Sequence, residues 1–225
     1  LIEGGQVREY EPTLGPDIHL LATMKDHGFI RDPGGYVTAL AQAFEQGGGT
    51  IMQAEVKDFD LSAGAICGIE TTQGRVACDD VVLATGVWSK PLMAKLGLNV
   101  PLETERGYHV IFEGATGVPA RPVMIASGKF VATPMAQGLR CAGILEFGGL
   151  DAAPSKAPLA LLRRQAKAAF PQLTATREIE WLGHRPAPSD SLPLIGQVGT
   201  SRVFTAFGHH HIGLTGGPKT GRLVA

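Results

Sequence analysis

The 225-residue chain has no excess of either charge, no long apolar run and few cysteines. Its 20 basic and 21 acidic side chains nearly balance, so charge gives no reason to expect nucleic acid or an acidic surface as a partner. No apolar run approaches the roughly 20 residues of a membrane-spanning helix. Cys67, Cys78 and Cys141 are odd in number and lack C-x-x-C spacing. We therefore expect reduced core thiols in a cytosolic protein rather than disulfides or a zinc framework.

The sequence also lacks a G-x-G-x-x-G turn that opens a βαβ unit. In dinucleotide-binding folds that turn brings backbone N–H groups against the pyrophosphate. Internal repeats and low-complexity tracts are absent too. A length of 225 residues suits one large domain or two small ones.

The first half predicts a helix, strands and a meander. Asp32-Pro33 is a good helix start, and the apolar residues that follow recur at helical spacing until residues 47–49, which are all glycine. Because one face of this helix is apolar, we expect it to be packed. Alternating residues and turn signals then predict strands at 50–56, 57–61, 66–71, 75–78 and 80–86.

In the second half the sequence pattern changes to short strands separated by turns. A short helix at 91–96 precedes four strands, at 106–112, 123–126, 129–133 and 139–146, that we expect to form an antiparallel sheet. A helix at 158–170 carries Leu159, Leu162, Ala166 and Phe170 on one face and ends at Pro171.

Most of the candidate functional residues lie in the C-terminal stretch. Residues 203–207 predict a buried strand, which runs into a glycine-rich turn and then a helix that begins near Pro218. Such a turn exposes backbone N–H groups in front of a helix dipole. These donors suit a phosphate, a carboxylate or the electron-rich edge of a reduced flavin.

Three motifs in this stretch occur in a recognisable order: W-x-G-x-R-P from Trp181, D-S-L-P-x-I-G from Asp190, and F-G-H-x-H-x-G-L-T-x-x-P-x-T-G-R-L from Phe207. The pattern resembles the C-terminal signature of FAD-dependent amine oxidoreductases of the D-amino-acid oxidase superfamily. Among these, it is most similar to the bacterial D-amino-acid dehydrogenases.

The resemblance implies an α+β and α/β fold. We expect the second half of a glutathione-reductase-like FAD domain, without its N-terminal G-x-G-x-x-G unit, and an antiparallel-sheet substrate domain. The expected boundaries are 1–96 for the FAD domain, 97–182 for the substrate domain and 183–225 for the return to the FAD domain. Glu9-x-Glu11-Pro12 resembles the loop after the mononucleotide half, so we expect the chain to start within a longer protein. Lacking the pyrophosphate turn, the chain alone should be inactive.

The function implied is oxidation of a D-amino acid to the imine, with hydride transfer from the α-carbon to FAD. Either oxygen or a membrane quinone chain could take the electrons. The implied location is cytoplasmic, with peripheral attachment to the inner membrane as an alternative. Other readings are a glycine, sarcosine or hydroxyproline oxidoreductase, a non-catalytic subunit or scaffold of the same fold, and a metal enzyme built on the three consecutive histidines.

The substrate side of the site centres on Arg185. Arginine's fork of donors matches a carboxylate bidentately, and in the family the arginine of W-x-G-x-R-P holds the substrate carboxylate. The alternative is a structural role, in which Arg185 pairs with Asp190. Arg106 matches a position that assists carboxylate binding in some relatives, although a structural role is equally open. His211 could change charge near neutral pH.

The resemblance also implies the flavin contacts. The backbone of Val56 would meet the adenine, and the segment after the strand at 80–86 would lie along the dinucleotide: Ala84, Thr85, Gly86 and Trp88. The flavin ring would contact residues 209–215, namely His209, His210, His211, Ile212, Gly213, Leu214 and Thr215. An extended backbone would put His209 and His211 on one side. No Cys, Asp or Glu nearby in sequence completes a metal ligand set, so we expect no metal.

Overall fold

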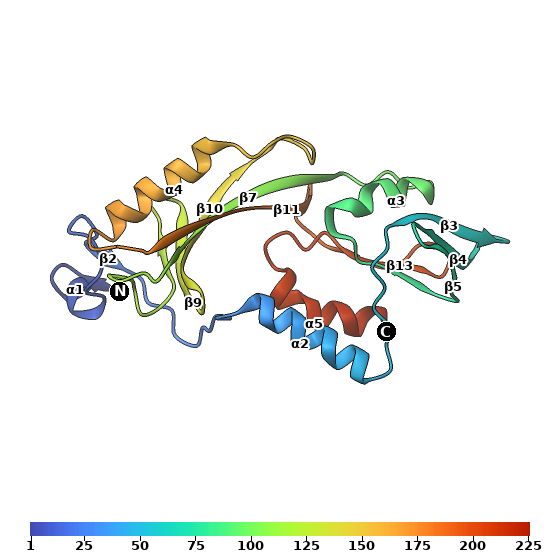
Figure 1. Ribbon diagram of the computed structural model, residues 1–225, viewed down its shortest axis with the longest axis horizontal. Coiled ribbons are helices and arrows are strands. Elements are labelled where there is room, and N and C mark those ends of the chain that lie inside the picture. Colours follow the sequence, from blue (N-terminus) through green and yellow to red (C-terminus); the bar gives the residue numbers. More distant parts are fainter. The chain divides into compact units, whose positions relative to one another are not determined.

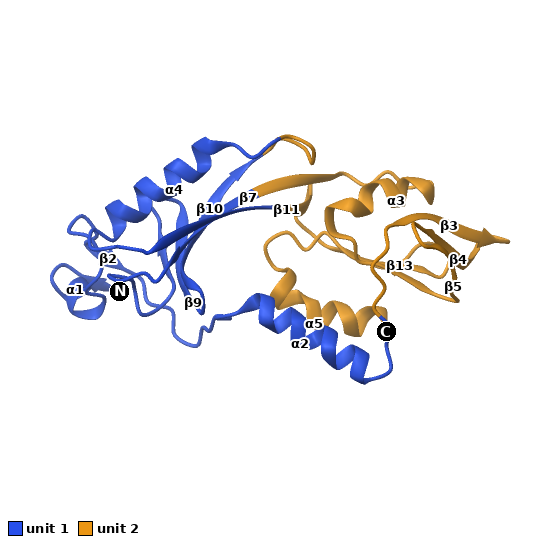
Figure 2. Ribbon diagram, viewed as in Figure 1, with its two compact units in different colours: residues 1–50, 107–146, 153–183 blue, residues 51–106, 147–152, 184–225 orange.

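The computed structural model describes residues 1–225 as a mixture of helices and mainly antiparallel strands (Figure 1). The chain divides into two compact units (Figure 2). Unit 1 contains residues 1–50, 107–146 and 153–183, and unit 2 contains residues 51–106, 147–152 and 184–225. The expected α+β class is confirmed. None of the helices combines the length and the apolar character that crossing a membrane requires.

A five-stranded sheet forms the centre of unit 1. Its strand order is β11-β7-β10-β9-β8. β9 pairs antiparallel with both β8 and β10, which confirms the antiparallel character predicted for this region. The bounds are β7 (Leu102–Glu113), β8 (Val123–Ile125), β9 (Phe130–Met135), β10 (Gly138–Glu146) and β11 (Arg177–Pro188). The ends of β7 and β11, residues 102–106 and 184–188, belong to unit 2.

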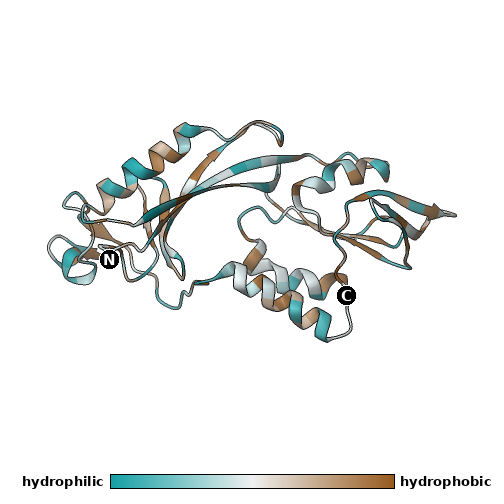
Figure 3. Ribbon diagram, viewed as in Figure 1, coloured by the Kyte–Doolittle hydropathy of each residue, from teal (hydrophilic) through white to brown (hydrophobic).

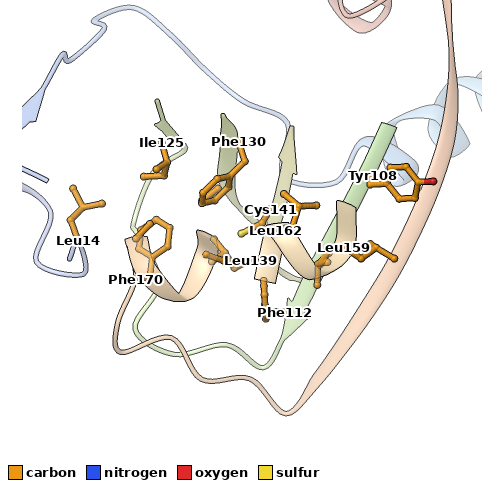
Figure 4. Close-up of a cluster of buried hydrophobic side chains, with 14 of the residues drawn as sticks. Leu14, Tyr108, Phe112, Ile125, Phe130, Leu139, Cys141, Leu159, Leu162 and Phe170 are labelled. Atoms are coloured by element: carbon orange, nitrogen blue, oxygen red, sulfur yellow. The ribbon is translucent and has the colours of Figure 1, made fainter. Parts of the chain in front are cut away.

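The predicted amphipathic helix covers this sheet. α4 (Lys156–Ala169) buries Leu159, Leu162 and Ala166 and packs on β10. Figure 4 shows Leu159 and Leu162 of this helix within the same cluster as Phe130 and Cys141 from the strands. The helix stops before Pro171, as the helical spacing and the proline predicted.

The N-terminal part of unit 1 packs against the same core. It comprises β1 (Ile2–Glu3), α1 (Gln6–Tyr10) and β2 (Leu20–Leu21). Val7 and Leu14 belong to the same buried cluster, in which Figure 4 labels Leu14. The buried carboxylate of Glu11 accepts a hydrogen bond from the Ala120 N–H at 3.2 Å.

α2 (Pro33–Gln46) begins where the sequence predicted, with the Asp32 side chain accepting from the Gly35 N–H at 2.9 Å. Its apolar face, marked by the brown segments of this helix in Figure 3, is nevertheless exposed. Val37, Leu40 and Phe44 keep between 53% and 57% of their surface. The expectation that this face is packed is therefore wrong for the residues of this chain.

Unit 2 contains the predicted meander, β3 (Val56–Ser62), β4 (Ala65–Thr71) and β5 (Gly74–Ala77). The β3–β4 turn uses Ala63 and Gly64 at φ 52° and 83°, as a two-residue turn with both φ values positive requires. The strand predicted at 50–56 is wrong, since the segment before Val56 pairs with no strand of the chain. Ile51 and Met52 are half exposed there.

A second sheet in unit 2 has the order β12-β13-β6. β13 (Val203–Phe207) runs antiparallel to β12 (Leu194–Gln197) and parallel to β6 (Val81–Leu83). The 3₁₀ turn η1 (Gly86–Trp88) and α3 (Ser89–Lys95) follow β6, and Leu92 and Met93 of α3 share a core with Leu83 and Phe207. The short helix and the strand at 203–207 are thus confirmed.

The last helix, α5 (Gly213–Val224), begins five residues before Pro218 and not near it. Pro218 lies inside α5, where proline removes one N–H donor and its ring crowds the carbonyl four residues earlier. The segment predicted to be a glycine turn is therefore the first turn of the helix.

Candidate functional site

Two chain segments leave the parallel pair β6–β13 at the same edge. Val81 is opposite Val203 and Leu83 is opposite Thr205, so residues 84–88 and 208–211 emerge side by side. The carboxyl ends of parallel strands are where open α/β sheets bind ligands. Gly208 has φ 83°, and a Cβ there would lie 2.8 Å from Pro188 Cγ, so this exit requires glycine.

The segment after β6 is open to a ligand. Ala84 and Thr85 are exposed, and Trp88 keeps 56% of its surface. The Thr85 hydroxyl lies 2.9 Å from the Ser89 hydroxyl, and Gly86 turns the chain at φ 57°. The predicted flavin residues of this segment therefore share an accessible edge of unit 2.

The first turn of α5 presents unpaired donors. Gly216 is the first residue of α5 whose N–H donates to a carbonyl four residues earlier, that of Ile212 at 2.7 Å. The N–H groups of Gly213, Leu214 and Thr215 have no acceptor in the chain. Ile212, by contrast, donates its N–H to the His209 carbonyl. The free donors at the start of α5 are thus the N–H groups of Gly213, Leu214 and Thr215.

A hydrogen bond from the His209 side chain links α5 to the segment that follows β13. Nε2 of His209 lies 2.7 Å from the Thr220 hydroxyl, and that hydroxyl donates to the Gly216 carbonyl at 3.1 Å. Because the hydroxyl proton is already used, Nε2 of His209 must be the donor. His209 is half-buried and is held against the helix by this hydrogen bond.

His210 and His211 converge on one carboxylate. Nε2 of His210 lies 2.8 Å and Nε2 of His211 lies 3.3 Å from Oε2 of Glu105. The two ring centroids are 4.0 Å apart. The extended backbone that would put His209 and His211 on one side is not present, because His210 is left-handed at φ 51°, and the side chains of His210 and His211 turn the same way. A non-glycine residue held there costs about 1–3 kcal/mol, and such strain often marks functional sites.

Glu105 is the functional residue that the sequence did not reveal. It lies in β7, and only 8% of its side chain is exposed. No carboxylate lies near the histidines in sequence, but in three dimensions Glu105 joins them, since the donor atoms of Glu105, His210 and His211 lie within 4.8 Å of one another. We interpret the cluster as hydrogen-bonded, because 2.8 Å is an ordinary N–H···O distance and the positive charge of Arg185 is close by.

Burial lowers the pKa of His211 below its ordinary value, and the neighbouring His210 and Arg185 act in the same direction. The Glu105 carboxylate opposes them. The His211 side chain is 53% exposed. His211 therefore tends to stay neutral near pH 7 while its ring remains accessible.

Arg185 lies between residues that contact both exit segments. His184 packs edge-on to Trp88 at 6.1 Å between centroids and lies 3.0 Å from the Thr104 hydroxyl. The Pro186 carbonyl accepts the His210 N–H at 3.2 Å.

The guanidinium of Arg185 itself is partly buried and makes no hydrogen bond or ion pair within the chain. Asp190, the alternative structural partner, instead accepts from the Leu192 N–H. Arg185 is thus available for an anionic ligand.

Arg106 and Val56 occupy different surroundings. Arg106 is 1% exposed and donates to the Ala152 carbonyl at 2.9 Å. A Cβ on Gly148 would lie 2.6 Å from its Nη1, so the segment 147–152 rests directly on this guanidinium. Val56 opens β3 opposite Thr71, just before a register shift.

Comparison with known proteins places these features in a family. The whole chain, residues 1–225, matches the family described as DAO, FAD dependent oxidoreductase. The chain belongs to this family. It is 40% identical to D-amino-acid oxidase of Bradyrhizobium diazoefficiens over 229 residues, which cover 100% of this chain and 54% of that protein. Glycine oxidase of Pseudomonas putida is 32% identical over 173 residues, which cover 75% of this chain and 47% of the relative.

The crystal structure of glycine oxidase from Geobacillus kaustophilus superposes with a TM-score of 0.84 at 25% identity, over 99% of this chain and 60% of that one. The resemblance inferred from the C-terminal motifs, including FAD dependence, is confirmed. The chain spans about half the length of the two curated relatives.

Proposed function

We propose that this chain binds the amino-acid substrate and the flavin ring in an FAD-dependent oxidoreductase that converts a D-amino acid to its imino acid. The observation that carries the proposal is the unpaired guanidinium of Arg185, whose positive charge acts on His211 just before α5 begins. An amino acid brings a carboxylate and a flavin brings an electron-rich edge, and both need donors of this kind.

Arg185 would hold the substrate carboxylate. Its planar fork offers two parallel N–H···O bonds, which lysine cannot reproduce. A fixed carboxylate restricts how the α-carbon lies, and orientation of this kind accounts for much of an enzyme's advantage. Arg106 would act on this pocket indirectly, through the segment 147–152 that its guanidinium supports.

The residues present fit the ring end of FAD. The unpaired N–H groups of Gly213, Leu214 and Thr215 would hold the pyrimidine edge, helped by a helix dipole worth about 0.3–1 kcal/mol. Trp88 and residues 84–86 would line the dinucleotide, His209, His210 and Ile212 would shape the ring site, and Val56 would meet the adenine. When bound, FAD supplies the two-electron acceptor.

The pyrophosphate end has no matching turn in these residues. We therefore expect the chain alone to retain FAD weakly and to be inactive. The proposed domains are a glutathione-reductase-like FAD domain in 1–96 and 183–225 and a substrate domain in 97–182. The parallel pair β6–β13 and the meander β3–β5 support the first, and the five-stranded sheet supports the second.

The test uses the chain joined to a G-x-G-x-x-G nucleotide-binding segment, called the extended protein below. Its flavin spectrum is recorded without oxygen while D-amino acids, glycine, sarcosine and hydroxyproline are added one at a time. Bleaching by D-amino acids supports the proposal. Bleaching by glycine or sarcosine alone would favour the second candidate, a glycine oxidoreductase, which the similarity to glycine oxidases supports. A folded extended protein that binds no flavin would indicate a scaffold.

A further inference from the structure

Glu105 and His211 form a carboxylate–imidazole pair beside the proposed carboxylate anchor. Nε2 of His211 lies 3.3 Å from Oε2 of Glu105, and the negative charge of the carboxylate favours the neutral tautomer that has its proton on Nε2 and its lone pair on Nδ1. No hydrogen bond in the chain engages Nδ1, and the ring is half exposed. The pair therefore presents an unoccupied proton acceptor to a ligand.

We propose that His211 accepts the proton that the substrate's ammonium group loses before oxidation, and that Glu105 is the positioning residue that fixes its tautomer. This rests on the proposed function. An N–H bond of the ammonium breaks and leaves its electron pair on nitrogen, and the proton binds Nδ1 of His211. The neutral amine and an imidazolium result, and the imidazolium later gives its proton to water.

The charges around His211 favour this order of events. Arg185 of β11 and the N-terminus of α5 disfavour an imidazolium, as does His210, whereas Glu105 of β7 favours it. In the free protein, burial, His210 and Arg185 lower the pKa of His211, so the ring is neutral and ready to accept. A substrate carboxylate on Arg185 would cancel one of the opposing charges. Binding of the substrate thus makes His211 a stronger base.

The arrangement also offers a reason for the strained backbone conformation at His210. With an extended backbone, consecutive side chains point to opposite sides, and only one imidazole could reach Glu105. The left-handed φ of 51° at His210 brings both rings to the same oxygen, and His210, at 2.8 Å, holds the buried carboxylate in place for His211.

The test measures kcat/KM for anaerobic flavin reduction by a D-amino acid in the extended protein, as a function of pH. In the wild type the value should rise as pH increases through the pKa of His211. His211→Gln should lose about 100-fold or more at pH 7 and recover at alkaline pH, where the substrate arrives as the neutral amine. His27→Gln, at an exposed histidine of unit 1, is the matched control and should follow the wild type.

Glu105→Gln separates positioning from general structural damage. The pH at which activity falls should move, because the imidazolium loses the carboxylate that stabilises it, whereas structural damage would lower the rate equally at every pH. The NMR titration of His211 gives a readout that does not depend on activity. A non-oxidisable carboxylate such as acetate should raise the pKa of His211 in the wild type and leave it unchanged in Arg185→Ala.

A wild-type rate and pH profile for His211→Gln would overturn the inference and leave the proposed function standing. An extended protein whose bound flavin is reduced by no amino acid would overturn both.

Discussion

Glu105 and His210 are 105 positions apart, yet Oε2 of the carboxylate lies 2.8 Å from Nε2 of the imidazole. Since Glu105 is buried, Glu105→Ala leaves the His210 imidazole without its hydrogen-bond partner and removes the carboxylate that lies 3.3 Å from Nε2 of His211. We expect the free energy of unfolding to fall by about 1–3 kcal/mol, measured by urea denaturation. Glu103→Ala, at an exposed position of the same strand, should change it by less than about 0.5 kcal/mol. Equal losses in the two variants would contradict the role given to Glu105.

Protonation of His211 should cost stability. Its pKa in the folded chain lies below the ordinary 6.5, so the unfolded chain binds the proton more readily. The stability difference between wild type and His211→Gln should be greatest above pH 6.5 and should shrink as pH falls toward the folded pKa. Urea denaturation between pH 5 and 8 checks this, with pH values taken from the ordinary histidine range. A difference that grows on acidification would show the opposite sign of shift.

Much of the fold could be predicted from local patterns, because the spacing of apolar residues and the positions of capping residues, glycine and proline determine where each element begins and ends. The start of α2 at Asp32-Pro33 and the packed face of α4 are examples. Two predictions that depended on other parts of the molecule failed. Residues 51–55 form no strand, although the Glu55 carbonyl accepts the Thr72 N–H, and the apolar face of α2 is exposed.

The site was predicted in part for the same reason. Arg185 and the residues after β6 and β13 follow sequence motifs, and parallel pairing brings them together. Glu105 could not be found, because no local pattern links it to residues 105 positions later. Nothing in the three histidines revealed the left-handed φ that separates His210 and His211 from His209.

Cys141 should resist alkylation in the native chain. It is 0% exposed, and burial raises the pKa of its thiol to about 12, so almost no thiolate forms at ordinary pH. Cys67 and Cys78 are half-buried and free of disulfides. Treatment with iodoacetamide at neutral pH, followed by mass spectrometry, should label these two at most.

The same treatment in urea should label all three cysteines, which provides the control. Labelling of Cys141 in the folded chain at the rate of the other two would show that the core around it opens readily.

Gly183 is required by the tryptophan two residues before it. A Cβ at Gly183 would lie 1.8 Å from Cη2 of Trp181, whose ring stacks on His109 at 4.6 Å between centroids. Gly183→Ala must displace the indole, so we expect a loss of about 1–3 kcal/mol and a changed tryptophan emission spectrum. Gly28→Ala, where a Cβ meets nothing within 4 Å, should leave both unchanged. An unshifted emission in Gly183→Ala would refute this packing.

The most direct test of the account is the Arg185 clamp in the extended protein. The rate of anaerobic flavin reduction is measured against D-amino-acid concentration in wild type and Arg185→Ala, with flavin content determined in both. We predict that the variant keeps its flavin and binds the substrate about 30-fold or more weakly, the equivalent of roughly 2–5 kcal/mol for a desolvated charge pair. An unchanged concentration dependence with flavin still bound would contradict the central claim.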